Sequence, residues 1–230
     1  MLIWIKGCLN PKEMRSKLLD GNSKWVQNVI NYLESCHTGD FQTGTQEEVN
    51  KNVSENSKLS DYHDPTQTVP DPPPPKCKKM HEVVSETCKA CQQNVTWRQK
   101  FQNIIDDLLL KSNVHNCERG QKKDGTRRKN KTFTGCRDNK WNRCKARFPR
   151  TVVENSHIDD TGAIHLKKRE PWINTFSPVV TYLYRCNTDV TSLSSGTAIK
   201  AVVLYVSDYI TKSTLKTHTI FDSIKSVFHK

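Results

Sequence analysis

Two tyrosines and a lysine near the C-terminal end of the chain stand at a spacing that could support catalysis. Tyr205 and Tyr209 are four residues apart, and Lys212 lies three residues further on. On a helix the two phenols point the same way, one turn above the other, and the lysine follows on the next turn. The run from Gly196 to Lys212 is too apolar for a surface helix and predicts a largely buried one. Both interpretations stay open at this point, a catalytic pair with Lys212 or two ordinary core aromatics.

A second group of residues has the types and spacing of metal ligands. Eight cysteines and histidines fall within 68 residues of an otherwise polar segment, namely Cys77, His81, Cys88, Cys91, His115, Cys117, Cys136 and Cys144. The two residues between Cys88 and Cys91 let both sulfurs reach one tetrahedral zinc ion at about 2.3 Å. This spacing is typical of a zinc knuckle.

The other ligands of such an ion must come from elsewhere in the chain. His115 and Cys117 form a pair one helix further along, and Cys77, Cys136 and Cys144 are additional candidates. They are enough for one site with spares or for two incomplete sites, and the sequence does not say which four residues bind. Unliganded cysteines in a polar loop are the alternative. We predict a structural Zn²⁺ site because so polar a segment needs a metal to fold.

The segment from Arg119 to Arg150 is strongly basic. It has thirteen lysines and arginines against two acids, in a chain whose net charge is +12 and whose sequence pI is about 9.3. Aromatic side chains are interleaved with the charge and could stack on unpaired bases. Many basic loops bind nothing, but beside a zinc-like spacing we expect this one to contact DNA. The candidate DNA-binding residues are Arg127, Arg128, Lys129, Arg137, Lys140, Trp141, Arg143, Lys145, Arg147 and Arg150.

Composition limits the class of protein. Of the 230 residues only 34% are hydrophobic and the mean hydropathy is −0.73, which predicts a substantial share of loop or disordered chain. The apolar start, Met1 to Ile5, is too short for a signal peptide or a membrane span. Nine cysteines without a signal peptide indicate a reducing compartment. Three of them, Cys8, Cys36 and Cys186, have apolar neighbours and are expected in the core.

The elements that must position these residues follow from periodicity. We predict a strand at 2–5, a helix that begins at Pro11, and a second helix at 23–36. An amphipathic helix is expected from Trp97 to Leu110, and a hairpin at 151–168 with its turn at 159–162. Residues 176–186 suit a strand or a short helix. The chain closes with an amphipathic helix at 213–230.

Four regions follow from these patterns. Residues 1–37 form a first αβ part, and 38–76 are expected as an extended polar and proline-rich linker that packs against little. Residues 77–150 are the Cys/His-rich basic insert, and 151–230 the C-terminal part with the two-tyrosine helix. The predicted fold class is α+β.

Short motifs in the second half of the chain form a pattern. They are Cys144-Lys-Ala-Arg-Phe-Pro-Arg150, Ile164-His-Leu-Lys-Lys-Arg169, Trp172-Ile-Asn174 and Arg185-Cys-Asn-Thr-Asp-Val190. Together they resemble the replication-initiator (Rep) region of Helitron rolling-circle transposons, in particular the fungal type of its Helitron helicase-like domain. Residues 201–212 resemble that family's two-tyrosine motif, Tyr-x3-Tyr-x2-Lys. The first residues, Met1 to Gly7, are similar to the segment just downstream of the family's His-hydrophobic-His pair.

The resemblance implies a HUH-type palm and a nuclear protein that nicks and joins single-stranded DNA during transposition. In the family, the histidine pair holds Mg²⁺ or Mn²⁺, which polarises a scissile phosphate. One tyrosine attacks to leave a 5′-phosphotyrosine link, and the second serves strand transfer. A phenol with a pKa near 10 needs such help to act as a nucleophile. Tyr205, Tyr209 and Lys212 match these positions.

The chain departs from the family pattern at the cation site. None of its eight histidines forms a His-x-His, and the family's helicase domain is not represented, because no Gly-x4-Gly-Lys-Ser/Thr occurs. We therefore expect a truncated Rep fragment with an incomplete palm, inactive alone but able to bind single-stranded DNA and no membrane. The alternative is a non-catalytic, zinc-dependent DNA-binding or regulatory protein in which both tyrosines only pack.

Overall fold

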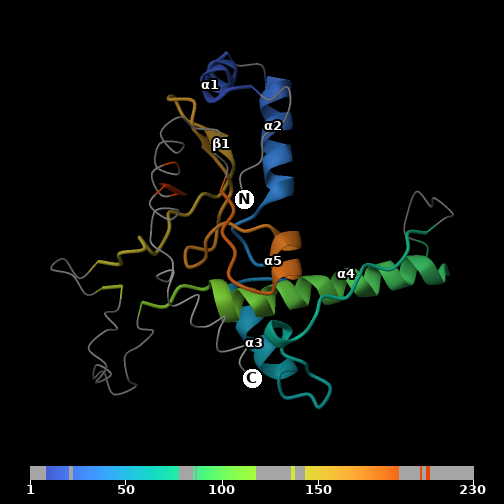
Figure 1. Ribbon diagram of the computed structural model, residues 1–230. Helices are drawn as coiled ribbons and strands as arrows, with labels where there is room; N and C mark the ends of the chain where they lie inside the picture. Colours follow the sequence, from blue (N-terminus) through green and yellow to red (C-terminus); the bar gives the residue numbers. More distant parts are fainter. Residues whose placement is uncertain are drawn as a thin grey trace, which may run out of the picture. The chain divides into compact units, whose positions relative to one another are not determined.

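The computed structural model describes residues 9–20, 23–77, 85, 87–117, 136–137, 143–191, 203 and 206–207. Among these residues, helices and one two-stranded sheet confirm the coarse prediction of an α+β chain (Figure 1). The HUH palm stays a prediction. Contacts group the chain into two units, which are described separately: Met1–Asn22, Ile158–Ile164 and Ser192–Lys230 in one, Ser23–His157 and His165–Thr191 in the other.

The first unit contains α1, Pro11–Leu19, which begins as the sequence predicts. The Asn10 side chain accepts hydrogen bonds from the backbone N–H groups of Lys12 and Glu13, and the Glu13 carboxylate accepts one from Asn10 N–H. This reciprocal capping satisfies donors that a helix start leaves unpaired.

The turn of the predicted hairpin belongs to the same unit. Asp159 Oδ1 accepts hydrogen bonds from Thr161 N–H, at 2.9 Å, and from Ala163 N–H, at 2.9 Å. Gly162 follows with a φ of +74°, a left-handed conformation that glycine adopts without strain. The turn joins two short antiparallel strands, β1 His157–Ile158 and β2 Ile164–His165, so the hairpin prediction is confirmed.

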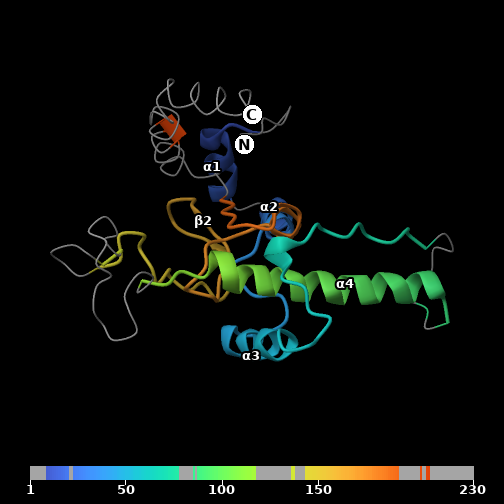
Figure 2. The same cartoon turned by 60° about the horizontal axis from the view of Figure 1, so that its bottom comes forward.

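Helix α4, Lys89–Leu108, is the longest element of the second unit and continues directly into η2, a π-helical turn at Leu109–Asn113. The sequence predicts a start near Trp97, but α4 begins eight residues earlier, directly after Cys88. Figures 1 and 2 show α3, Gln46–Asn56, against the C-terminal half of α4, with α5, Pro178–Tyr184, on another side. The ambiguous segment 176–186 is therefore mainly helical.

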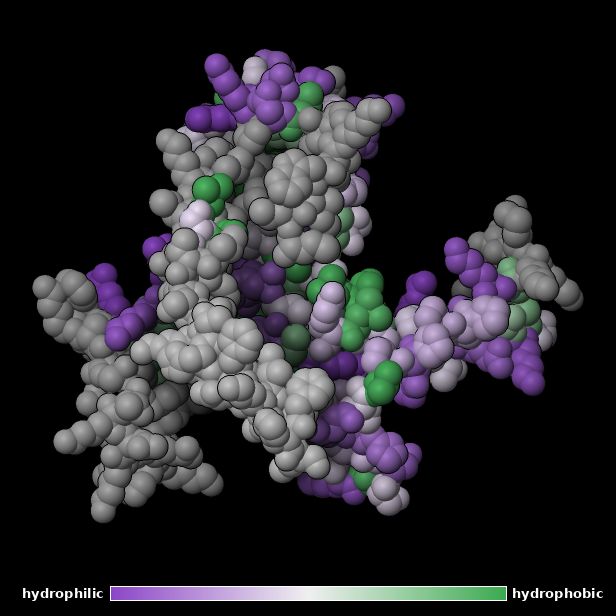
Figure 3. Space-filling view, in the orientation of Figure 1, coloured by the Kyte–Doolittle hydropathy of each residue, from purple (hydrophilic) through white to green (hydrophobic). Residues whose placement is uncertain are grey.

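The core of this unit forms where α4 and η2 meet the elements around them. Its buried residues are Phe41, Val49, Ile105, Leu109, Ile173, Phe176 and Tyr182. Trp97 and Phe101 lie one turn apart on α4, and their rings stack 5.1 Å apart against Tyr182. Beyond this core, Figure 3 shows a mainly hydrophilic surface over the N-terminal half of α4 and a hydrophobic patch over α5. On α5, Val179 and Leu183 are exposed.

The expectation of an unpacked linker at 38–76 is wrong. This segment forms α3 and the single turn η1, Pro65–Gln67, and it contributes Phe41 and Val49 to the core. The prediction failed because only a few apolar residues in the segment are buried, too few to give a visible period. A Thr45–Glu48 capping box, which the overall polarity concealed, fixes the start of α3.

A buried carboxylate fastens the beginning of this segment to α4. Asp106 accepts hydrogen bonds from Gln42 N–H at 2.7 Å, Thr43 N–H at 2.8 Å and Thr43 Oγ1–H at 2.6 Å. Burial raises the pKa of Asp106, although these three hydrogen bonds oppose the shift. Beside it, Asp107 accepts from the Tyr62 hydroxyl and pairs with Lys111, at 2.7 and 3.0 Å.

Helix α2, Ser23–Cys36, has the predicted bounds and is followed by a bridge between Thr38 and Phe176. Cys36 is only half-buried and Cys186 is exposed, so the expectation that both are core residues is wrong. The strand predicted at 2–5, Cys8 and the helix at 213–230 lie outside the described residues. In the described part of the chain, no helix has the length and apolar character that a membrane span requires.

Candidate metal centre

Two groups of cysteine and histidine side chains lie near the two ends of the helix that α4 and η2 form. His115, Cys117, Cys136 and Cys144 make up the first group, called here the His115 cluster. Cys77, Cys88 and Cys91 make up the second, the Cys77 cluster. Within each group, the potential ligand atoms all lie within 4.8 Å of one another.

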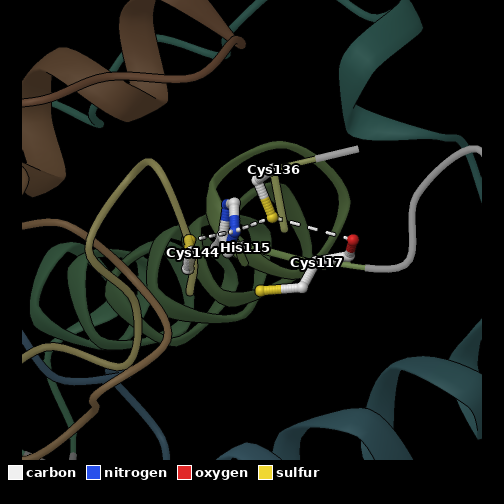
Figure 4. A group of neighbouring side chains, drawn as sticks. All are labelled: His115, Cys117, Cys136 and Cys144. Atoms are coloured by element: carbon white, nitrogen blue, oxygen red, sulfur yellow. Dashed lines mark hydrogen bonds between the residues drawn. The ribbon is translucent and has the colours of Figure 1, made fainter. Parts of the chain in front are cut away.

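In the His115 cluster the imidazole lies between two thiols (Figure 4). His115 Nε2 is 3.2 Å from Cys144 Sγ and 3.4 Å from Cys136 Sγ. A tetrahedral zinc ion with bonds of about 2.3 Å to sulfur and about 2.0 Å to nitrogen places these atoms about 3.6 Å apart. One imidazole and three thiols around a common point therefore suit zinc in both ligand type and spacing.

The π-helical turn η2 places His115. Val114 N–H donates to Leu109 C=O at 2.9 Å, which closes the wide turn, and His115 N–H donates to Trp172 C=O at 2.8 Å. The His115 ring stacks on Phe148, with centroids 4.3 Å apart and planes 9° apart. The ring is therefore held from the backbone and from one face before any metal binds.

Backbone groups also hold the cysteine side of the cluster. Lys145 N–H donates to Cys136 C=O at 2.8 Å, and Arg147 N–H donates to Cys144 C=O at 3.0 Å. Burial tends to raise the pKa of Cys144, but the N–H groups of Phe148 and Ala146, with the neighbouring thiols, hold it below its usual value. Such N–H donors around a sulfur are the environment of a thiolate ligand.

The other thiols explain why a cation suits this arrangement. Burial, together with hydrogen bonding and charge from Cys117 and Cys144 beside it, raises the pKa of Cys136 to about 12. Three thiolates at this distance repel one another, so they cannot all ionise without a positive charge between them. A divalent metal ion supplies that charge, and the cluster could therefore hold a metal ion such as zinc.

The Cys77 cluster lies at the start of α4. Cys88 directly precedes the helix and Cys91 lies in its first turn. Cys77 comes from the end of the proline-rich segment, and its Sγ is 3.6 Å from that of Cys88.

The structure thus divides seven of the eight candidate metal ligands between two places. The expected combination of Cys88 and Cys91 with His115 and Cys117 does not form, because the 20-residue helix α4 separates the two pairs. Cys136 and Cys144 join His115 and Cys117 instead. The sequence spacing identified the types of the ligands but not which of them share a site, because that depends on where the fold places Cys136 and Cys144. His81 lies outside the described residues.

Three of the four motifs on which the resemblance rests are joined by hydrogen bonds. Arg150 donates to Asn174 Oδ1 through Nε and Nη2, at 3.2 and 2.9 Å, and Asn174 Nδ2 donates to Asp189 Oδ2 at 3.0 Å. Arg150 N–H also donates to Pro171 C=O at 2.8 Å. Asn174 and Asp189 were not singled out from the sequence by function, and only their positions inside the motifs marked them.

In comparisons with protein-family models, curated proteins and solved structures, nothing matches this chain. The residues themselves therefore carry the functional argument.

Four of the candidate DNA-binding residues are exposed around the His115 cluster: Arg137, Arg143, Lys145 and Arg147. Arg150 is the exception, because its guanidinium binds Asn174 and lies 4.6 Å from the centre of the Phe148 ring. The expected contact of Arg150 with DNA stays a prediction, as it does for the four exposed residues. The other predicted residues, Arg127, Arg128, Lys129, Lys140 and Trp141, lie outside the described part of the chain.

The two tyrosines and Lys212 also lie outside the described residues. Of the helix predicted at 196–212, the structure describes Val203, Val206 and Ser207, and all three are helical. Val203 is 57% exposed, contrary to the burial that the apolar run predicts for it.

Proposed function

We propose that this chain is a zinc-stabilised, single-stranded-DNA-binding region of a Helitron-type Rep protein. The observation that carries the proposal is the His115 cluster, whose four ligands enclose most of the basic segment in the sequence. Residues 118–135 lie between Cys117 and Cys136, and residues 137–143 lie between Cys136 and Cys144. A metal bound there would fix both ends of the basic segment.

Charge supports DNA as the partner. The segment from Arg119 to Arg150 has a formal charge of +11, from thirteen basic and two acidic residues, whereas the whole chain has +12. Nearly all of the net charge is thus concentrated in and beside the candidate metal site. Lysines and arginines that track phosphates supply most of the sequence-independent affinity for single strands.

The role of zinc in this proposal is structural. His115 and the three cysteines would fill all four tetrahedral positions, so no position stays open for substrate. The metal would join the end of η2 to residues 136–148, which have no regular secondary structure of their own in the described part. The exposed side chains of Arg137, Lys145 and Arg147 would then be held at one place, ready to meet phosphates.

The resemblance adds the two tyrosines to the proposal. Tyr205 and Tyr209 would stand where the family has its nucleophiles. Hydrogen bonds from Arg150 to Asn174 and from Asn174 to Asp189 join three of the family-like motifs. The catalytic Mg²⁺ or Mn²⁺ does not fit the residues present, because no two histidines are separated by a single residue. His157 and His165 do stack, 5.0 Å apart, but they come from two strands. We therefore derive no cleavage step for this chain.

DNA binding is tested with the full chain, a fluorescent single-stranded oligonucleotide and a series of salt concentrations. We expect the dissociation constant to rise with salt, and the triple variant Arg137→Gln/Lys145→Gln/Arg147→Gln to lower the logarithmic salt slope by about 2, at about 0.7 per lost phosphate contact. Lys24→Gln/Lys51→Gln/Lys58→Gln removes the same charge from exposed positions elsewhere and should leave the slope unchanged. Equal slopes for all three proteins would contradict the proposal.

A covalent-adduct assay tests whether the chain itself is catalytic. The chain is incubated with a labelled oligonucleotide and Mg²⁺ or Mn²⁺, and protein-linked label is measured after denaturation. We expect none. An adduct that disappears in Tyr205→Phe would show instead that the chain is an active nuclease, and DNA binding without an adduct fits both the inactive Rep region and the zinc-dependent regulator.

A further inference from the structure

The Cys77 cluster is separate from the site that the proposed function uses. Helix α4 has 20 residues and so spans about 30 Å, with Cys88 and Cys91 at one end and His115 beyond the other. No single ion can therefore be shared by the two clusters, and the Cys77 cluster needs an explanation of its own.

We propose that Cys77, Cys88 and Cys91 bind a second zinc ion, which fastens the proline-rich segment 70–77 to the first turn of α4. The three Sγ atoms lie within 4.8 Å of one another, and those of Cys77 and Cys88 are 3.6 Å apart. Two thiolates on one tetrahedral zinc ion lie about 3.8 Å apart, so the observed pair is already at ligand spacing. It is far from the roughly 2.05 Å of a disulfide bond.

The position at the helix start suits a negatively charged metal–thiolate centre. Cys88 is the residue that caps α4, yet its side chain makes no capping hydrogen bond, and the first turn has no acidic residue. Unpaired backbone N–H groups at a helix start attract negative charge. Three thiolates on Zn²⁺ carry a net negative charge, which would occupy this end of the helix in place of a carboxylate.

The proline-rich segment shows what the ion would hold. Residues 70–77 run along α4 (Figure 2), where Asn94 Nδ2 donates to Pro75 C=O at 3.2 Å and Lys100 pairs with Asp71 at 2.6 Å. Both contacts are exposed, and exposed ion pairs stabilise a fold by less than about 1 kcal/mol. Prolines have no N–H groups to add. A metal link through Cys77 would fix the end of the segment that these weak contacts leave poorly held.

A redox dithiol is the chemical alternative, because Cys-x-x-Cys at a helix start also occurs in thiol–disulfide enzymes. Cys91 is buried, with 8% of its surface exposed, and a third sulfur lies beside the pair. A third thiol favours metal, since a redox pair needs only two. Three ligands leave one tetrahedral position for a further ligand.

The test counts zinc in the full reduced chain by native mass spectrometry. We expect two zinc ions in the wild type, one in Cys77→Ser and one in His115→Ala, each variant losing only the ion of its own cluster. Cys186→Ser, which changes an exposed cysteine, should retain two. One ion in the wild type that Cys77→Ser does not remove would overturn the second site, and so would a zinc-free Cys88–Cys91 disulfide, seen as the loss of two hydrogens.

Limited trypsin digestion tests whether the ion fastens the proline-rich segment to α4. Lys76 is exposed beside Cys77, and Lys58 is exposed in another part of the same unit. We expect Cys77→Ser to speed cleavage after Lys76 several-fold and to leave cleavage after Lys58 unchanged. Equal rates after Lys76 in variant and wild type would overturn the fastening role. The zinc ions of the two clusters are counted in separate variants. A negative result for the Cys77 cluster therefore does not bear on the His115 cluster or on DNA binding, which have their own tests.

Discussion

At the scale of single residues, several polar side chains that suggest chemistry by type serve to hold the fold together. Arg150 binds Asn174, and the half-buried Lys168 donates to the carbonyls of Glu170 and Ile173, both at 2.6 Å. Burial lowers the pKa of Lys168, although nearby carboxylates oppose the shift. The described residues form a single two-stranded sheet, so many of their backbone groups lie outside a ladder, and polar side chains such as Lys168 satisfy some of them.

Asp106 is the strongest example, and its removal should destabilise the fold. Asp106→Ala leaves the Gln42 and Thr43 donors without their acceptor, and each donor kept from water costs about 1–3 kcal/mol. Denaturant unfolding measures the loss. Asp61→Ala, at an exposed position nearby in the same unit, is the matched control and should change the unfolding free energy by less than about 0.5 kcal/mol.

His37 should make the unfolding free energy depend on pH. Its ring is buried, and burial lowers its pKa below the ordinary value of about 6.5. The unfolded chain therefore binds more protons than the folded one below that pH, so stability falls as the pH is lowered through this range. With zinc held saturating, His37→Gln should show a shallower loss between about pH 7 and 5 than the wild type. Parallel curves for the two proteins would refute this role.

At the scale of elements, α4 with η2 organises the second unit. Its C-terminal half carries the buried residues Ile105, Leu108 and Leu109, whereas its N-terminal half is mostly exposed and hydrophilic (Figure 3). The helix thus has a packed end and an end that, within the described part of the chain, lies against the proline-rich segment. The metal clusters stand at these two ends, where helix backbone groups lack partners.

Two leucines of the second unit, one buried and one exposed, form a matched pair for a test of the core. Leu109 is fully buried and Leu183, on α5, is 56% exposed. Leu109→Ala should lower the unfolding free energy by about 2–5 kcal/mol, because it removes buried methyl groups and leaves a cavity. Leu183→Ala changes the same atoms at the surface and should cost less than about 1 kcal/mol. Chemical denaturation of both variants measures the two unfolding free energies. Similar losses in the two variants would contradict the role of Leu109 in the core.

At the scale of the whole molecule, a metal ion bound at either cluster would replace part of an apolar core. Only 34% of the residues are hydrophobic, which limits the apolar area available for burial. Metal binding would add to the stability of the fold, because the ligands are brought together only in the folded chain.

Removal of zinc should therefore destabilise the chain strongly. We expect a chelator, or His115→Ala, to lower the thermal midpoint by more than 10 °C, which for a chain of this size corresponds to roughly 3 kcal/mol or more. Cys186→Ser serves as the control, since Cys186 belongs to neither cluster. A midpoint that stays the same after complete zinc removal, checked by metal analysis, would show that the clusters do not support the fold.

The sequence by itself determined the features that neighbouring residues control. The bounds of α2, the start of α1 at Pro11, the hairpin turn with Gly162 and the types of the metal ligands all follow from patterns over a few residues. Tertiary structure alone decided which ligands meet, because His115 reaches Cys136 and Cys144 across 21 and 29 residues of chain. It likewise decided that the polar segment 38–76 enters the core, through isolated contacts such as that of Asp106 with Thr43. Such long-range contacts leave no local period in the sequence, which is why they were missed.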